Sequence, residues 1–304
     1  MRVVSLLPSA TEIVGALGAM EHLVGVTHEC DWPPVVSSRA RVTTSAVDST
    51  RTPREIDTQV RELANAGTPL YALKERTIRD LHPDLILTQA LCEVCAVHEG
   101  DVRSLASALS PSPNVVALNA TTLDAVLDDI NRVGSALGLP EEAEELLDGL
   151  HARLNNVHHT LKTAKAPRPR VALVEWCDPL FTGGHWIPDM IRRAGGTDVI
   201  GKSAERSRTM NAGELRDANP EIVIVAPCGY NLQRAATEAR ALLARDDWSW
   251  ARTRAVWAID ANAFASRPGP RLVEGVEIMA RMFNPSLFTP LDAAHAIRVN
   301  EPAN

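Results

Sequence analysis

Two features are missing from this 304-residue sequence: a long apolar run and an excess of basic residues. No apolar run approaches the roughly 18 residues that a membrane-spanning helix needs, so we do not expect an integral membrane protein. The formal net charge is -7 and the pI is near 5.7. Because nucleic-acid phosphates are bound by clustered lysine and arginine, this charge argues against a DNA or RNA partner.

A recognisable secretory leader is also missing. The chain begins MRVVSLLPSATEIVGALG, where Pro8, Ser9, Thr11 and Glu12 interrupt a short apolar run. We therefore expect a cytoplasmic protein, or a periplasmic one if a leader is absent from this chain. Cytoplasmic thiols stay reduced, so the five cysteines, an odd number, are expected to be free or metal-bound rather than disulfide-bonded.

Catalytic motifs are scarce as well. The sequence contains no GxSxG elbow, no Walker loop, no GxGxxG after a predicted strand and no HExxH. Glu175 and Asp178 are a candidate acid–base pair, but acidic residues in loops are more often hydrogen-bonded or solvated. We expect a noncatalytic protein.

What the sequence does contain is a repeated alternation of short apolar strands with amphipathic helices, which is typical of an α/β fold with mostly parallel sheets. At this length two lobes are the default. We expect Rossmann-like lobes at residues 1–119 and 166–304, joined by a helical connection at 120–165. The connection includes one long helix from Pro140, about 36 Å long at 1.5 Å per residue. Ser9 and Glu12 have the spacing of a capping box at the start of the first helix.

All five cysteines come just after predicted strands, and scarce aromatic residues share their loops. Ligands of open parallel sheets bind beyond the carboxyl ends of the strands. If both lobes turn these edges toward each other, one cleft collects thiols, imidazoles, indoles and carboxylates. The candidate ligand-binding residues are His28, Glu29, Cys30, Trp32, Gln89, Cys92, Cys95, Glu175, Trp176, Cys177, His185, Trp186, Tyr230, Phe264 and Arg267.

Structural alternatives stay open for these residues. A free cysteine often acts as a small buried hydrophobe, and Trp176 and Trp186 can simply cover the core of the second lobe. Glycines beside His185 allow a close backbone approach, which favours a ligand-facing role for that histidine. Arg267 either points toward the cleft or forms a structural salt bridge.

A metal site is a separate hypothesis. Cys92 and Cys95 have CxxC spacing, and His28 with Cys30 would complete a tetrahedral site for zinc or iron. A lone CxxC is a weak signal, and a redox-active dithiol is the other interpretation of this pair.

Six blocks carry a family resemblance: SLLPSATE, GVTHECDWPP, PDLILTQALCEVCAV, VEWCDPLFTGGHWIPDMIRRAGG, NPEIVIVAPCGY and SRPGPRLVEGVEIMARMFNP. Together they resemble the cobalamin-binding and iron-siderophore-binding substrate-binding proteins of ABC importers, and most closely a leaderless cobalamin-binding branch. The resemblance implies a class III periplasmic-binding-protein fold, with ligand clamped between two lobes that the long helix holds nearly rigid.

The resemblance also implies a metallo-organic ligand, cobalamin or a related corrinoid, packed against aromatic side chains with few direct polar contacts. The aromatic candidates are Trp32, Trp176, Trp186, Tyr230 and Phe264. An ABC transporter permease is the implied partner, and Glu75 and Glu214 lie near the helices that carry the docking carboxylates of such receptors. Two alternatives remain: a receptor for a metal ion, haem or iron–siderophore chelate that uses cysteine and histidine ligands, and an enzyme acting on a corrinoid or another metal chelate.

Overall fold

The computed structural model describes residues 1–89 and 97–300. The chain divides into two compact units: unit 1 comprises residues 1–120 and 124–148, and unit 2 comprises residues 121–123 and 149–304. None of the helices in the described ranges combines the length and the apolar character that a membrane span requires.

Unit 1 contains, within the described residues, a five-stranded sheet with the strand order β3-β2-β1-β6-β7. All of its neighbouring strands run parallel. The strands are β1 (Val3–Ser5), β2 (Leu23–Val26), β3 (Ala40–Arg41), β6 (Leu85–Thr88) and β7 (Asn114–Ala117). Central strands β1 and β6 are buried along their whole length, as parallel strands covered on both faces usually are.

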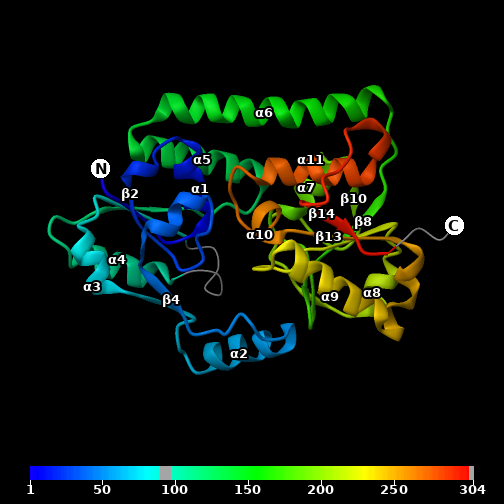
Figure 1. Cartoon of the computed structure of the whole chain (residues 1–304), viewed down its shortest axis with the longest axis horizontal. Coiled ribbons are helices and arrows are strands. Elements are labelled where there is room, and N and C mark those ends of the chain that lie inside the picture. The colour runs from blue at the N-terminus through cyan, green and yellow to red at the C-terminus, as the bar shows by residue number, and fades with distance from the viewer. Residues whose placement is uncertain (90–96, 301–304) are drawn as a thin grey trace. The chain divides into compact units, whose positions relative to one another are not determined.

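The helices of unit 1 follow the alternation that the sequence predicts (Figure 1). They are α1 (Pro8–Ala16), α2 (Pro53–Asn65), α3 (Glu75–Leu81), α4 (Glu99–Ser107) and α5 (Leu123–Leu137), with short 3-10 turns at Met20–His22 and Pro34–Ser38.

The predicted capping box at Ser9 and Glu12 is wrong. Helix α1 begins one residue earlier, at Pro8, and its N-cap residue Leu7 has no side-chain cap. Proline at the first helical position has φ already set for the helix and no N–H to satisfy, so Ser9 falls inside the first turn. A capping box does exist in α2, where Thr52 and Glu55 bond each other's backbone amides.

A two-stranded antiparallel ribbon accompanies this parallel sheet. Strand β4 (Thr43–Ser45) pairs with β5 (Tyr71–Leu73), so that Thr43 lies opposite Leu73 and Ser45 lies opposite Tyr71. The run at 69–73 is apolar like the strands of the parallel sheet, but Tyr71–Leu73 pairs with a polar segment, TTS. The ribbon carries Thr43 and Tyr71.

Unit 2 has a seven-stranded sheet among the residues described. Its parallel centre consists of β8 (Arg170–Cys177), β12 (Ile222–Val225) and β13 (Ala255–Ile259). Strand β9 (Leu180–Thr182) returns antiparallel to β8, β11 (Thr209–Met210) continues that edge, and β14 (Ala296–Arg298) pairs antiparallel with β13. Strand β10 (Thr197–Asp198) pairs with the start of β8.

The helices of unit 2 are α7 (Ile187–Arg193), α8 (Ala212–Asp217), α9 (Leu232–Ala244), α10 (Ala261–Phe264) and α11 (Leu272–Phe283), with 3-10 turns at Asp246–Thr253 and Pro285–Leu287. Helices α8 and α9 pack against an aliphatic core that also holds the fully buried Trp248.

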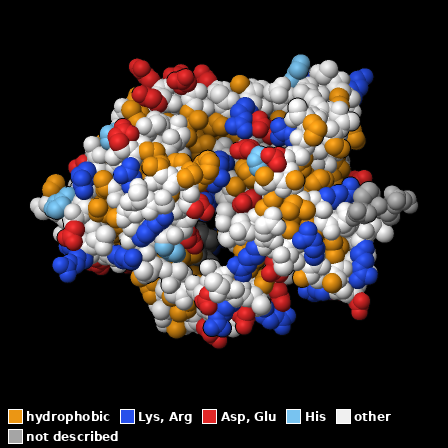
Figure 2. Space-filling view, in the orientation of Figure 1, with side chains coloured by type: hydrophobic (Ala, Val, Ile, Leu, Met, Phe, Trp, Pro, Cys, Tyr) orange, Lys and Arg blue, Asp and Glu red, His pale blue; other side chains and the backbone are white. Residues whose placement is uncertain are grey.

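Helix α6 (Pro140–Thr163) belongs to unit 1 in its first part and to unit 2 in its second. Figure 2 shows acidic side chains gathered over its start, where Glu141 and Glu142 occupy the first turn. Negative charge there complements the positive end of the helix dipole. Near its start α6 lies close to α5, because a Cβ on Gly134 would come within 2.5 Å of the Cβ of Ala143.

Candidate ligand-binding site

A hollow opens in unit 1 at the carboxyl ends of β1 and β2, beside the β4–β5 ribbon. The hollow is small and partly open to solvent. Ligand sites of parallel sheets form at this edge. The lining residues are Leu6, Pro8, Thr27, His28, Glu29, Thr43, Tyr71 and Val97.

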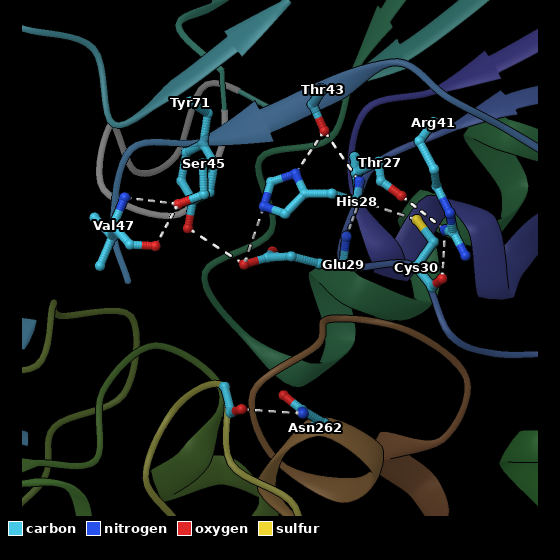
Figure 3. A network of polar contacts seen from close by, with 11 residues as sticks. Thr27, His28, Glu29, Cys30, Arg41, Thr43, Ser45, Val47, Tyr71 and Asn262 are labelled. Carbon is cyan, nitrogen blue, oxygen red and sulfur yellow. Dashed lines mark hydrogen bonds and ion pairs between the residues drawn. The ribbon is translucent and has the colours of Figure 1, made fainter. Parts of the chain in front are cut away.

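His28 is the best-defined polar group of the hollow (Figure 3). The Oγ1 of Thr43 lies 2.8 Å from Nδ1 of His28 and accepts a hydrogen bond from the His28 amide at 3.1 Å. The other ring nitrogen, Nε2, is covered and has no hydrogen-bond partner within the described residues. The imidazole lies 5.5 Å from the ring of Tyr71, centroid to centroid. Thr43 and Tyr71 thus fix the imidazole from two sides.

The imidazole of His28 is held neutral. Partial burial lowers its pKa, and the positive charges of Lys74 and Arg41 lower it further. Arg41 is itself fixed, since its guanidinium donates to the carbonyl oxygens of Thr27 at 2.9 Å and Cys30 at 2.6 Å. Near neutral pH the ring therefore offers one N–H donor and one lone pair.

Glu29 lies beside His28 at the open side of the hollow, and its side chain is 45% exposed. Its Oε1 is 3.9 Å from Nε2 of His28 and accepts a long hydrogen bond, 3.4 Å, from the hydroxyl of Tyr71. The Tyr71 hydroxyl and the Nε2 atom of His28 therefore both lie near one carboxylate oxygen, at distances longer than ordinary hydrogen bonds, which cluster at about 2.7–3.2 Å.

Cys30 faces the interior of unit 1. It is buried, and its Sγ lies 3.1 Å from the hydroxyl oxygens of both Thr11 and Thr27. Its thiol is therefore bound to hydroxyls and does not converge on an ion with His28. This environment corresponds to the structural alternative for Cys30.

The expected zinc or iron site has no support in the described part of the chain. Residues 1–89 and 97–300 hold no group of three His, Cys, Asp or Glu side chains placed to bind a metal ion. Cys92 and Cys95 lie outside the described residues.

The two remaining candidates of unit 1 differ in exposure. Trp32 is 46% exposed in the loop after β2. Gln89 follows β6 directly and is buried.

In unit 2 the carboxyl ends of β8, β12 and β13 lie side by side, as the strand order requires. The amide of Cys228, after β12, donates to the carbonyl oxygen of Glu175 in β8 at 3.0 Å. The amide of Ala261, after β13, donates to the carbonyl oxygen of Tyr230 at 3.2 Å, and Asn262 Nδ2 donates to the carbonyl oxygen of Gly229 at 3.2 Å (Figure 3). Three loops far apart in the sequence form one edge.

Cys177 does not follow a strand, as the sequence suggested, but is the last residue of β8. The strand continues past Trp176 because β9 folds back and pairs Leu180 with Cys177. The thiol is part of the apolar core, and burial raises its pKa. It acts as a small hydrophobe.

Glu175 and Trp176 are half-buried at the end of β8. Oε2 of Glu175 accepts a hydrogen bond from the amide of Gly184 at 3.0 Å, which ties the strand to the loop that contains His185. Trp176 donates from Nε1 to the carbonyl oxygen of Asp178 at 3.2 Å and makes an edge contact with Tyr230, 5.4 Å between centroids.

Tyr230 is only 2% exposed, and the guanidinium carbon of Arg234 lies 3.7 Å above its ring. Its hydroxyl is buried and has no hydrogen-bond partner in the described ranges. Burial raises the pKa of Tyr230 to about 12, so the hydroxyl stays protonated.

His185 lies in a tight Gly-Gly-His-Trp turn with a positive φ of 53°. Its amide donates to the carbonyl oxygen of Glu205 at 2.6 Å, and its carbonyl accepts from the amide of Ala204 at 3.1 Å. Burial lowers the pKa of the half-buried imidazole, and Arg206 lowers it further. Gly184 is required here, since a Cβ would come within 2.3 Å of the amide nitrogen of Ser207.

Trp186 and Phe264 are buried, and Phe264 makes an edge contact with His295, 5.1 Å between ring centroids. Arg267 is half-buried. Of the two expected docking carboxylates, Glu75 forms an ion pair with Arg79 at 3.3 Å, and Glu214 forms one with Arg208.

Sequence reasoning missed Thr43 and Tyr71, both of which line the unit 1 hollow. Tyr71 carried a usable signal, because the chain has only two tyrosines. Thr43 carried none, since threonine is common and the ribbon that positions it pairs two segments separated by the whole of α2.

Residues 3–258 match the family model described as periplasmic binding protein. The chain belongs to the periplasmic binding protein family. The match spans most of both units, so it covers the hollow of unit 1 and the carboxyl edge of unit 2.

Curated relatives of this periplasmic binding protein share less than a quarter of its residues but align over most of its length. YvrC of Bacillus subtilis, an uncharacterized ABC transporter substrate-binding lipoprotein, is 24% identical over 303 residues, which cover 94% of this chain and 81% of that protein. A vitamin B12-binding protein of Vibrio cholerae is 23% identical over 281 residues, with coverage of 91% and 86%.

Solved structures confirm the fold. A periplasmic haem-binding protein of Pseudomonas aeruginosa superposes with a TM-score of 0.73 at 22% identity, covering 100% of this chain and 99% of that one. The vitamin B12-binding protein BtuF of Vibrio cholerae superposes with a TM-score of 0.65 at 21% identity, covering 94% and 97%. The expected α/β fold of class III periplasmic binding proteins is confirmed, and this family consists of noncatalytic substrate-binding proteins of transport systems.

Proposed function

We propose that this periplasmic binding protein binds cobalamin or a related corrinoid noncovalently, through residues at the carboxyl edges of its two sheets. Five of its curated relatives are described as vitamin B12-binding proteins, from Vibrio and Pectobacterium. A large metallo-organic ligand also agrees with the aromatic and imidazole side chains that end the strands of both units.

The observation that carries the proposal is the chemistry of the unit 1 hollow. Leu6, Pro8 and Val97 give it apolar surface, while His28 and Tyr71 add polar groups and Glu29 adds a carboxylate at its open side. A mixed lining of this kind suits the face and edge of a large organic ring better than it suits a bare ion. Cys30 and Cys177 are not part of the proposed site, because both thiols are buried away from it.

Haem or another iron chelate is the second candidate ligand. The specific observation in its favour is the half-buried imidazole of His28 beside the phenol of Tyr71, 5.5 Å apart by ring centroids. Both side-chain types ligate haem iron in proteins. Solved structures with the same fold include haem-binding proteins from Roseiflexus and Pseudomonas aeruginosa.

As partner we propose the permease of an ABC importer, and with it a periplasmic location in place of the cytoplasmic one expected from the sequence. Support comes from the Bacillus subtilis relative, described as an ABC transporter substrate-binding lipoprotein. Glu75 and Glu214 remain the proposed docking carboxylates, one in each unit. Their partners Arg79 and Arg208 would be displaced by basic residues of a permease.

An absorption spectrum tests the proposed ligand. The full chain is expressed in cells supplied with cyanocobalamin, purified through gel filtration, and scanned through the visible range. A corrin spectrum at near one equivalent per chain is expected. A haem Soret band in place of the corrin bands would favour the second candidate, and a colourless protein that stays colourless after incubation with either compound would contradict both.

A further inference from the structure

The hydrogen bonds available to the Thr43 hydroxyl determine the tautomer of His28. Thr43 is only 2% exposed, and within the described residues its hydroxyl contacts two groups, the His28 amide and Nδ1 of His28. The amide can only donate. If Nδ1 also donated, the hydroxyl hydrogen would have no acceptor, and a buried unsatisfied donor is costly. The hydroxyl therefore donates to Nδ1, and the ring hydrogen resides on Nε2.

This tautomer determines what His28 offers to a ligand. Nε2–H is a hydrogen-bond donor, and the lone pair that a metal ion would need is on Nδ1, where Thr43 occupies it. Arg41 and Lys74 also place positive charge close enough to lower the pKa of the ring, and the same charges oppose a metal cation at this position. The arrangement favours an acceptor oxygen over a metal ion.

The partner that Nε2–H now faces is the carboxylate of Glu29, 3.9 Å away and too distant for an ordinary hydrogen bond. A donor that is covered in the ligand-free chain and an exposed acceptor thus lie side by side at the hollow. A primary carboxamide satisfies both, since its carbonyl oxygen accepts from Nε2–H while its NH2 group donates to the carboxylate. A ligand carboxylate satisfies only the imidazole and is repelled by Glu29.

We propose that His28 and Glu29 together recognise a primary carboxamide at the edge of the ligand, with Thr43 setting the tautomer that makes His28 the donor. The inference rests on the proposed function and deepens it, because the edge of a corrin ring carries carboxamide side chains whereas that of haem carries carboxylates. Glu29 then discriminates amide from acid. His28 acts as a specificity-determining residue and not as an axial metal ligand.

The tautomer is tested on the ligand-free protein by two-dimensional ¹H–¹⁵N NMR of ¹⁵N-histidine-labelled chain near pH 8. The resonances of His28 are assigned by their loss in His28→Gln. The expected pattern is that of the Nε2–H form, and Thr43→Val is expected to shift it toward a mixture of tautomers, while Thr58→Val on the exposed face of α2 leaves it unchanged. An Nδ1–H pattern in the wild-type chain would overturn the inference without touching the proposed function.

Recognition of the amide is tested by calorimetry with cyanocobalamin and with its monocarboxylates, in each of which one side-chain amide has become an acid. Removing one hydrogen bond changes affinity by about tenfold. The wild-type chain is expected to bind at least one monocarboxylate about tenfold more weakly than cyanocobalamin. Glu29→Gln is expected to abolish that difference, and Glu62→Gln on α2 to preserve it.

His28→Phe is expected to lose about tenfold in cyanocobalamin affinity, and His28→Gln, which keeps an N–H donor, to lose less. His151→Gln on the exposed surface of α6 is the matched control. Glu29 is on the surface, so the Glu29→Gln chain is expected to fold and can be titrated even if the His28→Phe chain fails to fold. If the wild-type and Glu29→Gln chains each bind cyanocobalamin and its monocarboxylates with equal affinity, the carboxamide inference is overturned but the proposed function is not. A wild-type chain that does not bind cyanocobalamin overturns the proposed function and, with it, the carboxamide.

Discussion

The indole Nε1 of Trp186 donates a hydrogen bond to the carbonyl oxygen of Ala265 at 2.7 Å. Trp186 immediately precedes α7, and Ala265 immediately follows α10, so the bond joins two loops that are 79 residues apart. Trp186 is only 7% exposed. Its main role is therefore to fix the Gly-Gly-His-Trp turn against the end of α10, and this turn presents His185.

Trp186→Phe should destabilise unit 2 more than Trp248→Phe does. Both variants remove part of a buried indole, but only the first leaves a buried carbonyl oxygen without its donor, because Nε1 of Trp248 has no hydrogen-bond partner in the described residues. The expected difference is about 1–3 kcal/mol in the free energy of unfolding. Urea titrations followed by circular dichroism measure it, and equal losses would contradict the structural role of Trp186.

Gly184→Ala should also destabilise the turn. The added Cβ would meet the amide nitrogen of Ser207 at 2.3 Å, and backbone on both sides cannot give way cheaply. Gly149→Ala in α6 meets nothing within 4 Å and should stabilise the chain by about 0.5–1 kcal/mol, the usual helix preference for alanine. Thermal unfolding measures both changes, and a Gly184→Ala chain as stable as wild type would be inconsistent with the close approach.

The cysteines should differ sharply in reactivity. Cys228 is exposed, whereas Cys30 and Cys177 are buried, and burial raises the pKa of the Cys177 thiol. In the folded chain a thiol reagent should label Cys228 within minutes and leave Cys30 and Cys177 unlabelled until urea is added. Mass spectrometry of tryptic peptides measures labelling site by site. Rapid native labelling of Cys30 would show that its thiol faces solvent and reopen its role in ligand binding.

Stability should fall as the pH is lowered below 6.5, the ordinary histidine pKa. His28 and His185 have lowered pKa values in the folded chain, so below 6.5 the unfolded chain binds protons that the folded chain resists. Asp129, Asp198 and Glu238 have raised pKa values and act in the opposite direction, because the folded chain binds protons at these carboxyl groups more readily than the unfolded chain does.

Urea unfolding of wild type and of the double variant His28→Gln, His185→Asn between pH 7.5 and 5.5 measures this effect. The double variant should lose less stability over that interval. Asparagine is chosen at 185 because it tolerates the positive φ of 53°. Parallel pH profiles would mean that neither imidazole resists protonation.

The sequence predicted the strand and helix alternation well because those signals are local. Apolar runs such as 222–225 and the spacing of apolar residues in α6 are readable without knowing their partners. Prediction from the sequence failed where the structure of a segment depends on the strand with which it pairs. The antiparallel pairing of β5 could not be predicted because its polar partner, 43–45, gives no apolar signal, and Cys177 was placed after β8 because the return of β9 could not be foreseen.

The sequence predicted which loops approach one another but not the direction of their side chains. Placing residues after strands correctly gathered His28 and Glu29 in one hollow, and Tyr230 beside Trp176. It could not tell that the Cys30 thiol, two residues from His28, points toward Thr11 and Thr27 in the interior. Adjacent residues of a turn commonly face opposite ways, and only the packing decides which way each one points.

The most direct test of the central claim is isothermal titration of the full-length wild-type chain with cyanocobalamin, with haemin titrated in parallel. The account predicts one cyanocobalamin bound per chain with a dissociation constant in the micromolar range or tighter, and weaker binding of haemin. No heat with cyanocobalamin at micromolar protein, together with tight binding of haemin, would contradict it.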